Sequence, residues 1–302
     1  MQISANGVAL EVEDHGPTHG EPLLLIMGLG MQLVAWHTNF VASLVARGFR
    51  VIRFDNRDIG LSQRFDELGV PNLALDSIRY AIGLKVRAPY TVADMADDTA
   101  ALLDALHIPA AHICGASMGG MIAQQLAVRH PTRVKSLTLM MTSSGSRRLP
   151  GPTLKVRSAL ISRPGDPHDV GSIIEHYVRL YRLIGSPGYP ADDAYLHERL
   201  GLAVRRSYRP KGTARQMVAI AADGNRSRLL AQIKVPTQII HGKDDPLVPV
   251  AAGHDLAAKI TGAQLDVIEG MGHDLPEPLW PRFVAGITSA AGRAAGVAAV
   301  CS

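Results

Sequence analysis

One short segment, Gly115-Ala116-Ser117-Met118-Gly119, constrains the fold of this 302-residue chain more than any other. It lies between the apolar run 111–114, which predicts a short buried strand, and the periodic segment 118–129, which predicts a helix. A Gly-x-Ser-x-Gly between a strand and a helix is typical of the sharp turn that presents a serine hydroxyl above a parallel sheet. Ser117 is therefore a candidate nucleophile, and the alternative is an ordinary turn serine flanked by glycines.

A serine hydroxyl becomes a strong nucleophile beside a base, and the base needs an orienting acid. Two later strands, predicted over 236–241 and 265–268, are each followed by a polar cluster. The first cluster holds Asp244 and Asp245, and the second holds His273. Because open parallel sheets build their sites at the carboxyl ends of strands, we expect these side chains near the candidate serine. The chain order of serine, aspartate and histidine predicts a catalytic triad, although each group alone is also compatible with an ordinary loop residue.

The chain resembles the α/β-hydrolase superfamily over residues 1–145 and 230–290. The motifs that carry this resemblance are Met27-Gly28-Leu29-Gly30, the Asp-Asn-Arg-Asp-Ile-Gly-Leu-Ser stretch at 55–62, the Ser117 turn, the stretch 241–249 and Gly272-His273. The resemblance implies an α/β fold with a mostly parallel central sheet flanked by helices. It also implies Asp245 rather than Asp244 as the acid, since the family's acid usually stands just before a proline. The 55–62 stretch is similar to that of esterases related to aclacinomycin methylesterase, although many relatives have glycine where Asp58 stands.

The same resemblance implies an oxyanion hole built from backbone N–H groups. In this family one donor follows the nucleophile and the other lies in the loop after an earlier strand. These positions are Met118 and Leu29 here.

The segment Gly28-Leu29-Gly30 also matches the start of a dinucleotide-binding fingerprint. The third glycine position is Leu33, however, and its side chain would hold the helix away from the sheet.

The domain organisation follows from where strands and helices alternate. Alternation before residue 145 predicts a parallel sheet with right-handed crossovers, and it stops between residues 145 and 228. We expect residues 1–144 and 229–302 to form one core and residues 145–228 to form a helical cap insertion. Three helices are predicted there, over 172–184, 191–207 and 212–222. Elsewhere the pattern predicts an edge hairpin over 3–13, one helix near 33–47, an irregular segment over 65–90 and a helix after Thr91.

Charge and composition limit the function classes. Residues 147–228 carry fifteen Lys or Arg and seven Asp or Glu, which indicates either a solvated basic surface or attraction of anionic substrates. Two cysteines cannot form a disulfide framework, and no apolar run is long enough for a membrane span. The first residues lack a signal-peptide pattern, and no basic motif with interleaved aromatics is present. We expect a cytoplasmic protein with no nucleic-acid or membrane partner, no metal and no organic cofactor; the oligomeric state stays open.

These observations together predict hydrolysis of a small-molecule carboxylic ester through an acyl-enzyme on Ser117. Perhydrolase or haloperoxidase-type chemistry, lactone opening and carbon–carbon bond hydrolysis use the same triad and remain alternatives. A hydrolase-like ligand receptor is an alternative from a different class. A serine rather than an aspartate at position 117 argues against dehalogenase or epoxide-hydrolase chemistry.

Overall fold

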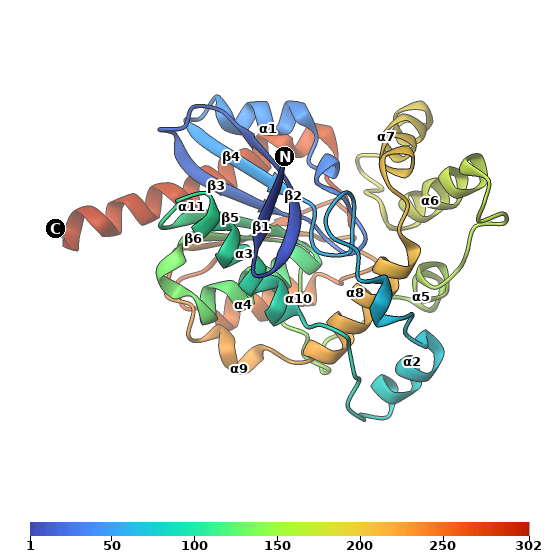
Figure 1. Ribbon diagram of the computed structural model, residues 1–302. Coiled ribbons are helices and arrows are strands. Elements are labelled where there is room, and N and C mark those ends of the chain that lie inside the picture. The colour runs from blue at the N-terminus through green and yellow to red at the C-terminus, as the bar shows by residue number, and fades with distance from the viewer. Residues whose placement is uncertain (302) are drawn as a thin grey trace.

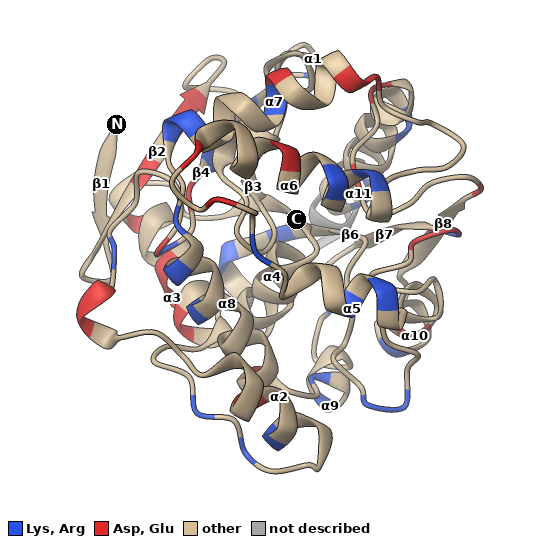
Figure 2. Cartoon of the chain, turned by 90° about the vertical axis from the view of Figure 1, so that its right-hand side faces the viewer, with Lys and Arg blue, Asp and Glu red and all other residues tan. Residues whose placement is uncertain are grey.

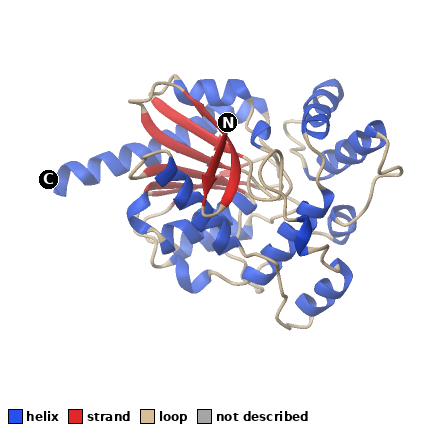
Figure 3. Ribbon diagram, in the orientation of Figure 1, coloured by secondary structure: helices blue, strands red, loops and turns tan. Residues whose placement is uncertain are grey.

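The computed structural model describes residues 1–301. A central sheet with helices on both faces forms three layers, and further helices lie to one side of them (Figure 1, Figure 3). Its eight strands lie in the order β1-β2-β4-β3-β5-β6-β7-β8. The strands are β1 (Gln2–Ala5), β2 (Val8–His15), β3 (Glu21–Ile26), β4 (Phe49–Phe54), β5 (Ala111–Ala116), β6 (Val134–Met140), β7 (Thr237–Gly242) and β8 (Gln264–Ile268). Strands β3 to β8 pair in parallel, whereas β1 and β2 pair antiparallel. The predicted mostly parallel sheet flanked by helices is confirmed.

The edge hairpin of β1 and β2 turns at Asn6 and Gly7, as the Asn-Gly signal predicts. Both residues have positive φ, 52° and 73°, which is the conformation that the tight turn of a hairpin requires. The register pairs Ile3 with Leu10. Strand β2 then pairs antiparallel with β4 and joins the hairpin to the parallel strands.

Two groups of helices cover the two faces of the sheet. Helices α3 (Val92–Ala105), α4 (Met118–Arg129) and α10 (Ala251–Lys259) pack on one face, and α1 (Thr38–Val45) and α11 (Trp280–Cys301) pack on the other. Strand β3 shows why: Leu24 and Ile26 point into the first core, while Leu23 and Leu25 point into the second. A strand that is buried on both faces has this continuous apolar sequence. Among residues 1–301, no helix combines the length and apolar content needed to cross a membrane.

Two predicted segments between the strands differ from the structure. The single helix expected near 33–47 is a 3₁₀ turn at Leu33–Ala35 followed by α1, whose first turn is capped by the His37 side chain. The segment 65–90, expected to be irregular, contains α2 (Leu73–Ala81). The side chain of Asn72 accepts a hydrogen bond from the Leu75 amide and starts that helix. Thr91 caps α3 as predicted, through a capping box with Asp94.

Within the described residues 145–228 the structure has helices and no strand. These are α5 (Leu154–Leu160), α6 (Val170–Ile184), α7 (Asp193–Arg206), α8 (Pro210–Asp223) and the start of α9 (Ser227–Leu230). The two ends of this insertion meet, because the Arg226 amide donates to the Ser144 carbonyl at 2.8 Å. Figure 1 shows α5, α6 and α7 standing to the right of the sheet. Helix α6 packs against α7 and also contacts a loop that follows a strand: the His273 amide, beyond β8, donates to the Ile184 carbonyl at 2.7 Å.

Candidate active site

Ser117 stands at a strained turn between β5 and α4. Its φ of 55° and ψ of −118° lie in a region that costs a residue other than glycine of order 1–3 kcal/mol. A side chain at Gly115 would collide with the backbone of Gly119, and one at Gly119 would collide with the Ile26 carbonyl. The Ser117 amide donates to the Met140 carbonyl at 2.9 Å and helps to hold the turn. The glycines therefore have the steric role that the motif predicts.

The structure brings Ser117, His273 and Asp245 into one hydrogen-bonded chain. The distance from Ser117 Oγ to His273 Nε2 is 3.0 Å, and that from His273 Nδ1 to Asp245 Oδ2 is 2.7 Å. The other carboxylate oxygen of Asp245 accepts from the amides of Leu247 and Val248 at 2.9 and 2.7 Å. Asp245 is 4% exposed and His273 is 9% exposed. A buried carboxylate held on both oxygens is suited to orient an imidazole.

The neighbouring Asp244 and His241 lie outside this chain. The Asp244 carboxylate accepts a hydrogen bond from the Gly270 amide at 2.8 Å. His241 is fully buried, and its Nε2 donates to the Val248 carbonyl at 2.7 Å. Its Nδ1 has no hydrogen-bond partner in the part of the chain that the structure describes, and burial lowers the pKa of this imidazole. His241 therefore supports the loop that carries Asp245 as a neutral, buried side chain.

The loop that carries His273 is held by the turn that follows α6. The hydroxyl of Ser186 accepts from the Gly272 amide at 2.9 Å and donates to the Asp274 carboxylate. Burial raises the pKa of Asp274, although the hydrogen bond from Ser186 opposes this. Sequence reasoning missed both Ser186 and Asp274, because a Ser-Pro-Gly turn carries no signal of what it will contact.

The predicted oxyanion-hole residues flank Ser117 from two elements. Met118 is the first residue of α4, and Leu29 lies in the loop after β3. Neither amide donates a hydrogen bond to another group within residues 1–301. A Cβ placed on Gly28 would lie 3.1 Å from the Ser117 Cβ, so the missing side chain lets the loop approach the serine. Both amides are therefore free to bind a ligand oxygen.

The Asp-Asn-Arg-Asp stretch connects this loop to the insertion. Asp55 is buried and accepts from the Leu33 amide at 2.6 Å and from Arg206 Nη1 at 2.7 Å. Arg215 of α8 makes two hydrogen bonds to the Asp58 carboxylate, at 2.6 and 2.8 Å. These arginines were not predicted as partners, since no local pattern links residues some 150 positions apart.

A second chain of serine, histidine and carboxylate lies near the amino ends of the central strands β3, β5 and β6. Ser136 Oγ is 2.7 Å from His112 Nδ1, and His112 Nε2 is 3.2 Å from Glu21 Oε1. Both Ser136 and His112 are almost fully buried, and they are partners in the β5–β6 ladder, whose register shifts between Ala111 and His112. No sharp turn presents this hydroxyl to a ligand, so it serves as an internal comparison for Ser117.

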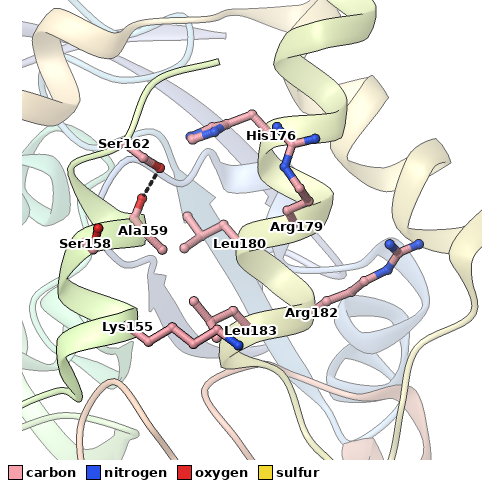
Figure 4. Close-up of a pocket in the computed structure, with 9 residues that line it drawn as sticks. All are labelled: Lys155, Ser158, Ala159, Ser162, His176, Arg179, Leu180, Arg182 and Leu183. Carbon is pink, nitrogen blue, oxygen red and sulfur yellow. Dashed lines mark hydrogen bonds between the residues drawn. The ribbon is translucent and has the colours of Figure 1, made fainter. Parts of the chain in front are cut away.

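A cavity with a volume of about 630 Å³ lies between α5 and α6. The residues that line it are Lys155, Ser158, Ala159, Ser162, His176, Arg179, Leu180, Arg182 and Leu183 (Figure 4). Leu180 and Leu183 point from α6 toward α5, whereas Arg182 points the other way. None of the three predicted triad residues lines this groove. Figure 2 views the molecule from the side where α5 and α6 lie and shows Lys and Arg on the helices there.

No group of three or more His, Cys, Asp or Glu among residues 1–301 has an arrangement that could hold a metal ion. The buried Cys114 contacts Met140, and burial raises the pKa of its thiol.

Comparison with known proteins finds similar sequences and similar structures. The alpha/beta hydrolase fold family matches residues 21–168. Rhodomycin D methylesterase DauP of Streptomyces sp. (strain C5) is 30% identical over 92% of this chain and 94% of its own length. A putative carbamate hydrolase, RutD of Variovorax paradoxus (strain S110), is 31% identical over 87% of this chain and 89% of its own. The crystal structure of the enol-lactonase from Burkholderia xenovorans LB400 superposes with a TM-score of 0.74 at 25% identity, covering 96% of this chain and 99% of that one.

The chain belongs to the α/β hydrolase fold family. The resemblance predicted from its motifs, including the similarity to methylesterases, is confirmed.

Proposed function

We propose that this protein hydrolyses carboxylic esters through an acyl-enzyme intermediate on Ser117. The observation that carries the proposal is the unbroken chain of hydrogen bonds from Ser117 through His273 to Asp245, with distances of 3.0 and 2.7 Å, at a strained turn. The similarity to DauP over most of both chains supports ester chemistry in particular.

Each residue of the chain has one task in the proposed reaction. His273 Nε2 takes the proton of Ser117 Oγ as that oxygen attacks the ester carbonyl carbon. Asp245 keeps the proton on His273 Nδ1 and stabilises the imidazolium. The amides of Leu29 and Met118 bind the oxyanion; one such donor contributes about 3–4 kcal/mol in comparable sites. His273 then protonates the leaving alcohol. In the second step His273 deprotonates a water molecule, which attacks the acyl carbonyl carbon and releases the acid from Ser117.

We also propose that residues 145–228 act as a cap over this site. The support is that α6 and α8 contact the loops that carry His273 and Leu29. Such a cap excludes water from the oxyanion and selects substrates by parts remote from the reacting bond. We propose that the groove between α5 and α6 binds a part of the substrate that is remote from the reacting bond, and that Leu180 and Leu183 form its apolar wall.

Lactone opening is the second candidate, because the enol-lactonase superposes over almost the entire chain. The proposed steps are the same, except that the leaving alcohol stays attached to the acyl group. The two candidates are therefore separated by substrate and not by residues.

The test compares Ser117→Ala with Ser136→Ala on p-nitrophenyl esters, methyl esters of aromatic acids and lactones. We expect Ser117→Ala to lower kcat about 10⁶-fold, the scale of nucleophile loss in subtilisin. Ser136→Ala removes a hydroxyl that is also paired with a histidine, and we expect it to keep activity. A fluorophosphonate should label Ser117 alone. An active Ser117→Ala enzyme, or a label on another residue, would reject the proposal.

A further inference from the structure

We propose that helix α8 positions the oxyanion-hole loop, with Gln216 as the positioning residue. This inference rests on the proposed ester hydrolysis. Gln216 is fully buried, and its carboxamide lies between two backbone groups of the core. Its Oε1 accepts from the Gly30 amide at 2.9 Å, and its Nε2 donates to the Arg57 carbonyl at 2.9 Å.

The contact with Gly30 lies next to the proposed donor. Gly30 directly follows Leu29 and has a φ of +68°, so the chain turns sharply at this point. A Cβ on Gly30 would lie 2.9 Å from the side chain of Thr213, which is three residues before Gln216 on α8. Residues three apart share one face of a helix, so α8 lays Thr213 and Gln216 together against the loop.

A buried ion pair fixes α8 where Gln216 can reach the loop. Arg215 and Asp58 are each 1% exposed and share two hydrogen bonds, a strong and directional arrangement. Tyr90 donates to the same carboxylate at 2.9 Å. Burial alone would raise the pKa of Asp58, but the hydrogen bonds from Arg215 and Tyr90 lower it, so the carboxylate stays charged. A side chain at Gly212 would collide with the Asp58 carbonyl, which shows how closely the helix approaches.

The other end of the loop is held by the same stretch of the core. Asn56 Nδ2 donates to the Met27 carbonyl at 2.9 Å, just before Gly28. Leu29 therefore lies between two tethers, Asn56 at Met27 and Gln216 at Gly30. This gives the Asp-Asn-Arg-Asp stretch, which the triad does not use, a role in the reaction.

The energetic consequence follows from how an oxyanion hole works. Its donors stabilise the transition state because they are already aimed when charge develops, so no reorganisation is needed. A displacement of about 1 Å at a catalytic group can cost about 100-fold in rate. Releasing Gly30 would let the Leu29 amide move, without changing Ser117, His273 or Asp245.

The test uses two substitutions at Gln216 and one matched control. Gln216→Met is similar in size and removes both hydrogen bonds. Gln216→Ala also removes both hydrogen bonds and leaves room for a water beside the two backbone groups, and it serves if the methionine variant does not fold. The control is Gln125→Met, because Gln125 is also a buried glutamine and donates to Asp223, at the far end of α8, at 2.7 Å.

The readouts are kcat/KM for an ester and the inhibition constant of a trifluoromethyl ketone, which forms a tetrahedral adduct with an oxyanion. We expect both Gln216 variants to lose about 10- to 100-fold in each, a fraction of the effect of deleting one donor. We expect Gln125→Met to keep both values within about threefold. Wild-type ketone affinity in the Gln216 variants, or an equal loss in the control, would overturn the inference.

Hydrogen exchange separates a failure of this inference from a failure of the proposed function. If the wild-type protein neither turned over an ester nor took the fluorophosphonate, ester hydrolysis at Ser117 would be wrong. The Gly30 amide would still report the positioning: we expect it to be protected in the wild type and to exchange faster in Gln216→Met and Gln216→Ala. Unchanged exchange of that amide would overturn the role of Gln216 whatever the activity.

Discussion

Replacing Asp245 by asparagine tests the proposed chain of hydrogen bonds at its most specific point. In the structure one carboxylate oxygen accepts from the Leu247 and Val248 amides, and the other lies 2.7 Å from His273 Nδ1. An asparagine can keep its carbonyl oxygen on the two amides. Its NH₂ group then faces Nδ1, where two donors would clash unless Nδ1 gives up its proton.

The magnitude follows from that change of tautomer. If Nδ1 loses its proton, Nε2 carries it and can no longer accept the proton of Ser117 Oγ at 3.0 Å. The same substitution in a serine-protease triad lowers kcat about 10⁴-fold. At about 1.36 kcal/mol for each factor of ten, this corresponds to about 5.4 kcal/mol of transition-state stabilisation. The free energy of unfolding should fall by no more than about 3 kcal/mol, because the two backbone hydrogen bonds survive.

Asp244→Asn is the matched control for this experiment. Its carboxylate accepts only the Gly270 amide among the described residues, and an amide oxygen can replace it there. We expect it to lower kcat less than tenfold. Steady-state rates with p-nitrophenyl acetate, together with urea unfolding of both variants, provide the measurements. Equal losses in the two variants, or a larger loss in Asp244→Asn, would refute the assignment of Asp245 as the acid.

Two further predictions concern stability and selectivity. Burial lowers the pKa of His241 below its ordinary 6.5, so the unfolded chain takes up this proton first as the pH falls. The free energy of unfolding should therefore decrease below about pH 6.5, and this group contributes at most about 1.4 kcal/mol per pH unit. In urea titrations at pH 5 to 7, His241→Gln should reduce the dependence of that free energy on pH. Leu180→Ala widens the groove and should change the order of kcat/KM among acetate, butyrate and octanoate esters, while fluorophosphonate labelling of Ser117 stays at the wild-type rate. An unchanged order would exclude the groove from substrate selection.

The parts of the fold that the sequence predicts well are those with a local cause. The Asn6-Gly7 turn, the Thr91 cap and the Gly-flanked turn at Ser117 each follow from the conformation that one or two residues prefer. The order of strand, helix and strand then determines which loops lie at the carboxyl ends of the parallel strands. For this reason Asp245 and His273 could be placed near Ser117. Helix α2 was missed because its cap, Asn72, stands in a segment without clear periodicity.

The contacts of the insertion could not be predicted, because they join residues far apart in the chain. Its excess of positive charge left two interpretations, a solvated surface or attraction of anions. The structure adds a third use, since many of these arginines bind oxygen atoms inside the molecule. The arginines that do so are Arg199, Arg206, Arg209, Arg215 and Arg226. Nothing in the local sequence distinguishes them from exposed ones such as Arg179, which lines the groove.

These contacts change what substitutions in the insertion should do. If its helices only shaped a pocket, changes there would alter selectivity and leave the chemical step intact. Yet Ile184 at the end of α6 and Ser186 in the turn after it hold the His273 loop, and α8 holds the Gly30 amide. The same helix α6 uses Tyr177 and Tyr181 to pack against α7, on a different face from Leu180. Truncating those tyrosines therefore loosens the supports of the histidine and should lower kcat for every ester, whereas truncating Leu180 should reorder the esters.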